Sequence, residues 1–274
     1  MAALNKKEVV SIIREYHENI IRYFPRYKLH FPNSMCLWSD IEYRYREIKT
    51  ILEYFTLPPP AKVLDVGTGY GQVMYFFKKK GYEVCGVDDD WGGRYKNGKE
   101  DEKIPYIEKM HCGLEKGIFP FPSHTFDLVT CLNTIEHIPC SPKKILRETF
   151  KVMKKSGIVF ISQPNIAEIG KRVSFFVKGK SPYCDITNWF NVPPEDFTGH
   201  SREYTKRELN YMIQKVGFEN LDSGFYDLEY YKWLAIRKQF PFVRRMLERL
   251  CYRPFRIMFP PLRSQVFVVG RRND

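Results

Sequence analysis

The chain has 274 residues, 43% of them hydrophobic, which is enough for one large globular domain with additions and excludes a chain that is disordered throughout. Lysine and arginine outnumber the acids by 44 to 32, and this formal charge of +12 indicates either contact with phosphate groups or a basic solvated surface. The seven cysteines form no C-x-x-C pair and no apolar run reaches the ~20 residues of a membrane span, so the sequence predicts neither a metal site nor a membrane helix. The N-terminus lacks the apolar segment of a signal peptide, and we expect a cytoplasmic protein.

Residues 1–57 are predicted to form a helical N-terminal extension. Apolar side chains recur at steps of three and four along its second half, at Ile41, Tyr45, Ile48, Leu52 and Phe55. The proline run at 58–60 ends this pattern, because proline cannot continue a helix. Residues 58–274 are predicted to form the main domain.

From residue 62 onwards, short apolar strands alternate with helices. Strands are expected over 62–67, 82–88, 126–133 and 158–162, and helices over 71–81 and from Pro142 to Gly157, the latter capped by Ser141. Such alternation predicts a parallel sheet with helices on both faces.

The rest of the chain, from residue 165 onwards, contains two irregular segments. Residues 165–203 are rich in proline, glycine and aromatic residues and are predicted to form a lid over a site. A helix capped by Thr205 and closed by Gly217 follows, and two final strands are expected over 221–228 and 265–272. Between these strands lies a basic, aromatic insertion, residues 230–263, which either packs as core or lies at a membrane surface.

The stretch VLDVGTGYGQ carries the clearest chemical signal. Gly67, Gly69 and Gly71 follow the first strand in the spacing G-x-G-x-G, whereas a dinucleotide site uses G-x-G-x-x-G. Asp65 lies two residues before the first glycine, where it would repel a pyrophosphate and attract an ammonium or a sulfonium. A nicotinamide-dependent dehydrogenase is therefore disfavoured.

The second strand ends in three acids, Asp88, Asp89 and Asp90. An acid at the end of this strand is placed to bind both hydroxyls of a ribose. The predicted ligand is therefore a nucleoside with a cationic, amino-acid-like arm.

These segments together resemble the class I SAM-dependent methyltransferases. The resemblance covers roughly residues 61–218 and is carried by VLDVGTGYGQ, VCGVDDD, FPFPSHTFDLVTCLNTIEHI, KKSGIVFISQPN and HSREYTKRELNYMIQKVGF. It implies an α/β fold of Rossmann-like type, with a doubly wound, mostly parallel seven-stranded sheet, an antiparallel terminal strand, N-terminal helices and a lid insertion. It also implies S-adenosylmethionine as the cofactor.

The resemblance assigns cofactor-binding residues along the chain. It implies that the methionine part lies against Asp65, Gly67, Thr68, Gly69 and Gly71, the ribose against Asp88 and Asp89, the adenine against Gly113 and Leu114, and the transferred methyl beside Asn133. The family often has an acid where Gly113 stands, so Glu115 or a backbone group would replace that contact. Alternatively, the glycines only form a tight turn, Asp88 is an exposed loop acid and Asn133 caps the strand.

Two histidines are candidates for the catalytic base. His137 follows the fourth strand, and His200 lies where the predicted lid returns to the fold. Either could deprotonate or orient a hydroxyl acceptor; the alternatives are a histidine that fixes a loop and a surface histidine beside a helix cap. Glu136 is expected to be structural or to face the cofactor.

The resulting prediction is a SAM-dependent methyltransferase that acts on a small-molecule, glycan or lipid-linked acceptor, at oxygen. The loop after the fourth strand resembles methyltransferases of quinone, sugar and surface-glycan pathways. An RNA methyltransferase and a non-catalytic, membrane-recruited module are the alternatives, and the net charge leaves contact with an anionic membrane surface open. The oligomeric state is not predicted.

Overall fold

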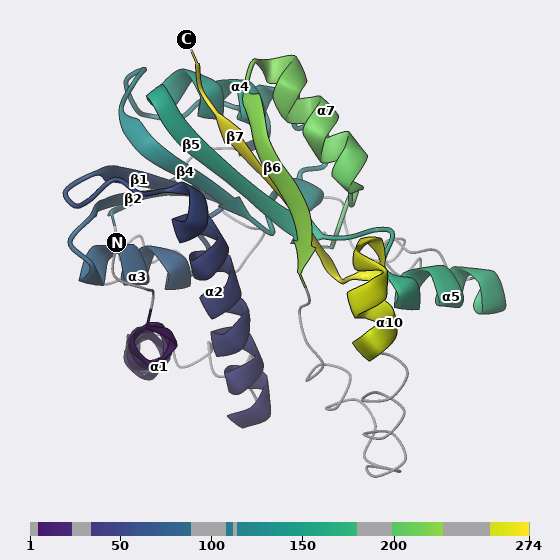
Figure 1. Cartoon of the computed structure of the whole chain (residues 1–274). Coiled ribbons are helices and arrows are strands. Elements are labelled where there is room, and N and C mark those ends of the chain that lie inside the picture. Colours follow the sequence, from purple (N-terminus) through teal and green to yellow (C-terminus); the bar gives the residue numbers. More distant parts are fainter. Residues whose placement is uncertain are drawn as a thin grey trace.

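The computed structural model describes residues 5–23, 34–88, 108–111, 114–179, 199–226 and 253–273 (Figure 1). Within these residues, seven strands form one sheet: β1 (Lys62–Val66), β2 (Glu83–Asp88), β3 (Glu108–His111), β4 (Phe126–Leu132), β5 (Met153–Pro164), β6 (Glu219–Tyr226) and β7 (Gln265–Arg271). The strand order is β3-β2-β1-β4-β5-β7-β6. Strands β1 to β5 pair in parallel, and β7 is antiparallel to both β5 and β6. The predicted mostly parallel, seven-stranded sheet is confirmed.

Helices cover both faces of the sheet, as predicted. The described helices are α1 (Lys6–Tyr23), α2 (Ser34–Tyr54), α3 (Gln72–Lys79), α4 (Lys143–Val152), α5 (Ile169–Lys178), α7 (Lys206–Val216) and α10 (Arg253–Met258), with short 3-10 turns η2 (Leu114–Lys116), η3 (Ile135–His137) and η6 (Pro260–Leu262). Buried residues of α1, α2 and α3 share one core with the sheet, and those of α4 and α7 share a second core on the opposite face (Figure 1). None of the helices described here is long and apolar enough to cross a bilayer.

Two helix ends follow the sequence prediction closely. Gly81, at φ +87°, follows α3, and Gly217, at φ +117°, ends α7. At the start of α7, Thr205 Oγ1 accepts a hydrogen bond from the Glu208 amide, and the Glu208 carboxylate accepts one from the Thr205 amide. This reciprocal capping box satisfies two amide groups that the helix itself leaves without partners.

The predicted boundaries of α4 are wrong. The cap residue is Pro142, not Ser141, and the helix begins at Lys143. It ends at Val152 instead of Gly157, and β5 runs through Gly157. A β-carbon on Gly157 would lie 2.9 Å from the Lys154 carbonyl oxygen and 3.3 Å from that of Asp127, so this glycine permits close backbone approach beside an irregularity in β4–β5 pairing.

Two of the predicted segments are described only in part. Residues 180–198 of the predicted lid and 230–252 of the basic insertion lie outside the described residues. The two ends of the predicted lid segment lie side by side, since Asn165 forms an isolated parallel bridge with Tyr204, and its role as a lid stays a prediction. The division at residue 57 stays a prediction.

A buried polar cluster fixes α2 to the sheet. Glu47 is completely buried and accepts hydrogen bonds from Arg44 Nη1 at 2.7 Å and from Ser162 Oγ on β5 at 3.1 Å. Asn133 Nδ2, just after β4, and the Tyr226 hydroxyl, on β6, lie 3.5 Å from the same carboxylate. Helix α2 is therefore held over the carboxyl ends of β4 and β5 by a single carboxylate, that of Glu47, which four donor groups surround.

Replacing Glu47 with alanine is expected to destabilise the protein by about 3 kcal/mol, the lower end of the cost of breaking a buried ion pair, because Arg44 keeps a second partner in Asp40. The free energy of unfolding in urea measures this loss. The matched control is Glu53→Ala on the same helix, where an exposed pair with Lys49 at 3.7 Å is expected to be worth less than about 0.5 kcal/mol. Equal losses for the two variants would contradict the role given to Glu47.

Candidate active site

The three glycines after β1 all adopt left-handed backbone conformations, with φ +75° at Gly67, +51° at Gly69 and +80° at Gly71. A β-carbon on Gly67 would lie 2.1 Å from Thr134 Oγ1, so this glycine lets the turn lie directly against the residue that precedes η3. A β-carbon on Gly69 would meet nothing within 4 Å. The turn is therefore tight against the fold on one side and open to a ligand on the other, which fits a cradle for a nucleoside-containing cofactor.

Asp65 lies under this turn, and its residue surface is 4% exposed. Burial raises the pKa of its carboxyl group to about 7, even though Thr130 Oγ1 donates a hydrogen bond to Oδ1 at 2.6 Å. A cation close to this group would favour the ionised carboxylate. A positively charged ligand would therefore stabilise the ionised form of Asp65, which is the kind of ligand that the sequence predicts for this position.

The remaining predicted cofactor residues occupy different positions around the turn. Asp88, at the end of β2, accepts a hydrogen bond from the Gly69 amide on Oδ2 at 2.6 Å, so it holds the turn in addition to its predicted contact with the ribose. Thr68, within the turn, is buried. Leu114 is completely buried in the core, and its contact with the adenine stays a prediction. Asp89 and Gly113 lie outside the described residues.

Asn133 directly follows β4 and has a left-handed backbone, with φ +51°. Its side-chain amide donates a hydrogen bond to the Tyr43 hydroxyl on α2, and its backbone amide donates to the Ser162 carbonyl at 2.8 Å. The side chain therefore connects β4 to the helix above it. Its predicted position beside the transferred methyl stays a prediction.

The two predicted catalytic histidines lie side by side. The ring centroids of His137, in η3, and His200 are 4.7 Å apart, with the planes at 84°. His137 Nδ1 lies 3.1 Å from the Gly199 carbonyl oxygen, and His200 Nδ1 lies 2.8 Å from Glu203 Oε1. The fold thus brings together two residues that are distant in the sequence.

Glu136 completes this cluster. One ligand atom each of Glu136, His137 and His200 lies within 4.8 Å of the other two. Glu136 is completely buried, and burial raises its pKa to about 8, outweighing a contact with its own backbone amide. Neither carboxylate oxygen accepts a hydrogen bond from another described residue. The sequence prediction favoured a structural or cofactor-facing role for Glu136 over a catalytic one.

Glu203 is a site residue that the sequence did not reveal. It is 4% exposed, and its carboxylate pairs with both His200 and Lys171 of α5. Burial opposes its ionisation, but the hydrogen bond from His200 and the charge of Lys171 hold its pKa below the usual value. The only signal in the sequence is its position three residues after His200, which becomes informative once the two are known to be in contact.

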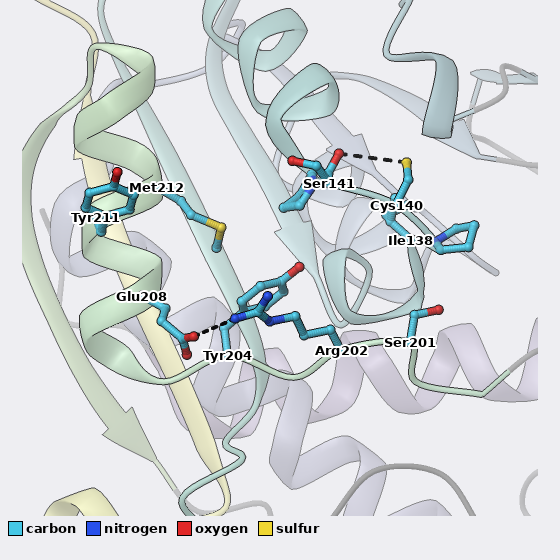
Figure 2. Close-up of a pocket in the computed structure, with 11 residues that line it drawn as sticks. Ile138, Cys140, Ser141, Ser201, Arg202, Tyr204, Glu208, Tyr211 and Met212 are labelled. Carbon is cyan, nitrogen blue, oxygen red and sulfur yellow. Dashed lines mark hydrogen bonds and ion pairs between the residues drawn. The ribbon is translucent and has the colours of Figure 1, made fainter. Parts of the chain in front are cut away.

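A cavity of about 600 Å³ lies between α7 and the segments that follow the two histidines in the chain (Figure 2). Ile138 and Ser201, which line it, directly follow the two histidines in the chain. Tyr204, Tyr211 and Met212 supply apolar walls, and the ion pair between Arg202 and Glu208 crosses one side at 2.8 Å. The cavity and the histidine cluster therefore share the same two chain segments.

Comparison with known proteins identifies the class. Residues 38–223 match the family profile described as a methyltransferase domain, so the chain belongs to this family. The protein is accordingly a SAM-dependent methyltransferase, and its methyl donor is S-adenosylmethionine, which fits the open turn at Gly69 and the buried acid beneath it.

Individual relatives are distant. A protein of Proteus mirabilis named ubiquinone biosynthesis O-methyltransferase is 32% identical over 152 residues, covering 49% of this chain and 58% of its own length. A protein of the same name from Vibrio cholerae is 25% identical over 216 residues, covering 73% of this chain and 80% of its own. A SAM-dependent methyltransferase from Archaeoglobus fulgidus shares the fold, with a TM-score of 0.55 and 18% identity over 91% of this chain and 100% of that one.

Replacing Asp65 with asparagine is expected to weaken S-adenosylmethionine binding at least about tenfold, because a charge-assisted contact is lost. Titration calorimetry measures this loss, and Asp222→Asn, on β6 beside Tyr54, is the control expected to bind normally.

The same variant is expected to change the pH dependence of stability. The pKa of about 7 in the folded state lies above the ordinary value of 3.8, so wild-type stability falls as the pH rises between these values and the penalty is complete above the higher one. The melting temperature of Asp65→Asn relative to wild type should therefore rise from about pH 5 to about pH 8 in the absence of ligand. A difference that does not change with pH would contradict the assigned pKa.

Proposed function

We propose that the protein transfers the methyl group of S-adenosylmethionine to a hydroxyl oxygen of a small-molecule acceptor. The observation that carries this proposal is the cluster of His137, His200 and Glu136 directly beyond the carboxyl end of β4. Ligands of open α/β sheets bind beyond these strand ends, beside the turn that holds the cofactor. The name of the two bacterial relatives, O-methyltransferases of ubiquinone biosynthesis, also supports an oxygen acceptor.

The cofactor, when bound, supplies a methyl group that a positively charged sulfur already activates. We assign its binding to the turn at Gly67, Gly69 and Gly71 together with Asp65 and Asp88. What remains for the protein is to exclude water, align the acceptor and accept its proton.

The need for a proton acceptor favours oxygen over an uncharged amine. A phenolic hydroxyl has a pKa near 10 and is a weak nucleophile until it loses its proton. In the proposed reaction the hydroxyl gives up its proton to the histidine cluster and its oxygen forms a bond to the methyl carbon. The carbon–sulfur bond breaks, and its electron pair neutralises the sulfur.

Replacing His137 or His200 with alanine is expected to lower the rate of methyl transfer by about 10²–10⁴, the usual contribution of a general base. Single-turnover assays with tritiated S-adenosylmethionine and a panel of catechols, hydroquinones, sugars and RNA measure this rate, and calorimetry checks that cofactor binding persists. His124→Asn is the matched control, because His124 is exposed and precedes β4, whereas the cluster lies beyond the opposite end of that strand. Normal rates in both alanine variants would contradict the role of the pair, and transfer to RNA alone would contradict a small-molecule acceptor.

We further propose that the face formed by α5 and α10 lies against an anionic membrane or a lipid-linked acceptor. Four apolar side chains of α5 are exposed, Val173, Phe175, Phe176 and Val177, as are three at and after the end of α10, Ile257, Met258 and Phe259. The segments next to the two helices are joined, because Asn165 Nδ2 donates to the Pro261 and Arg263 carbonyl groups. Exposed apolar side chains beside Lys171, Arg172 and Lys178 suit an interface with anionic headgroups.

The replacement Phe176→Ser is expected to reduce co-sedimentation with vesicles of mixed neutral and anionic phospholipid several-fold, because Phe176 is 90% exposed on this face. Tyr211→Ser on α7, where the side chain is 60% exposed, is the control. Absence of binding by the wild-type protein at low ionic strength would contradict the membrane proposal.

A further inference from the structure

We propose that Glu136, His137 and His200 bind a divalent transition-metal ion such as Zn²⁺, and that this ion binds the acceptor hydroxyl. The first part is a statement about this chain alone. The second part, the role of the ion towards the acceptor, rests on the proposed function.

The donor set is suited to such an ion. Two imidazoles and one carboxylate are three protein ligands of the kind that bind Zn²⁺, Mn²⁺, Fe²⁺ and Co²⁺, and three ligands leave coordination positions for water or substrate. Ligands at about 2.0–2.2 Å from a tetrahedral ion are about 3.3–3.6 Å apart. Since the three atoms already lie within 4.8 Å of one another, shifts of about an ångström bring them into place.

The hydrogen bonds of the two rings determine which ring nitrogen keeps the lone pair that a metal needs. The Gly199 carbonyl can only accept, so Nδ1 of His137 carries the proton and Nε2 carries the lone pair. The Glu203 carboxylate does the same for His200. Metal-bound histidines are usually oriented in this way, by a carboxylate or a backbone carbonyl that accepts a hydrogen bond from the ring nitrogen that does not bind the metal.

The buried carboxylate of Glu136 gives an independent indication. Both of its oxygens are buried without a hydrogen bond from another described residue, although buried polar groups are normally paired. One of them belongs to the group of atoms that converges with the histidines. A cation at this point would supply the partner that the protein does not.

The backbone fixes the segments that carry the ligands. The amides of Ser201 and Arg202 both donate to the Glu136 carbonyl oxygen, at 2.7 and 3.1 Å. Glu203, which accepts the hydrogen bond from His200, also forms an ion pair with Lys171, so its charge is compensated whether or not a metal is bound. The site is therefore assembled before any ion binds, which reduces the cost of binding it.

The proposed ion gives the cluster a stronger means of activating the acceptor. Coordination lowers the pKa of a bound hydroxyl, so that its proton is released to solvent water and the oxygen remains on the metal as the nucleophile. Without a metal, the histidine cluster itself accepts the proton, as in the reaction proposed above; with a metal, the same side chains hold the ion and act through it. The metal-free and metal-bound forms of the reaction make opposite predictions for metal binding.

The test uses the full-length protein, freed of metal with a chelator and titrated with Co²⁺. We expect one Co²⁺ per chain, with the visible absorption of an ion bound by nitrogen and oxygen, competed by Zn²⁺. His200→Ala is the decisive variant because the ring is about a third exposed and its loss should leave the fold intact. It should weaken Co²⁺ binding at least about a hundredfold, whereas His124→Asn should not change it.

Glu203→Gln tests the residue behind His200. We expect it to weaken Co²⁺ binding about 10–100-fold and to shift the absorption spectrum, because the imidazole loses its orientation and some basicity. Circular dichroism and S-adenosylmethionine binding should remain unchanged in both variants. A merely structural role of Glu203 would not move the spectrum.

The outcomes separate this inference from the proposed function. Stoichiometric Co²⁺ binding that His200→Ala abolishes supports the metal site, even if no hydroxylated acceptor is methylated. Absence of Co²⁺ binding, or binding that His200→Ala leaves unchanged, overturns the metal site, even if methyl transfer proceeds in the presence of chelator.

Discussion

The parallel pairing of β1 with β2 on one side and with β4 on the other is the constraint on which the site depends. In a parallel arrangement the carboxyl ends of all three strands open on the same edge of the sheet. The strand pairing therefore places the glycine turn, Asp88 and the segment from Asn133 to His137 at one edge, and contacts such as the hydrogen bond from the Gly69 amide to Asp88 then fix their positions. The approach of Gly67 to Thr134 shows how closely the ends of β1 and β4 are packed.

Three of the buried acids at this edge, Glu47, Asp65 and Glu136, differ in their partners, and this difference separates a structural role from a role in ligand binding. Glu47 is paired with Arg44 and accepts further hydrogen bonds, so it is a structural group that holds α2. Asp65 and Glu136 form no ion pair within the described part of the chain, and burial raises the pKa of each. A carboxyl group kept out of water without a cation is stabilised by a ligand that brings one. For Asp65 that ligand is the cationic cofactor, and for Glu136 we infer a metal ion.

The sequence predicted the features that local rules determine. Strand and helix alternation predicted the sheet, and Thr205 and Gly217 predicted the ends of α7. The predicted end of α4 at Gly157 was wrong, because the sequence alone does not distinguish a glycine that permits close approach between strands from a glycine that ends a helix. The two histidines were identified singly, but neither their contact nor the roles of Glu136 and Glu203 could be read from residues so far apart in the chain.

The most direct measurement is a crystal structure of the full chain with S-adenosylhomocysteine, the product of the donor. We expect the ligand in the crevice beyond β1 and β2, with its ribose at Asp88, its amino-acid arm at the turn around Gly69 and its sulfur directed towards Asn133 and His137. An empty crevice at saturating ligand, or a ligand bound elsewhere on the fold, would contradict the account.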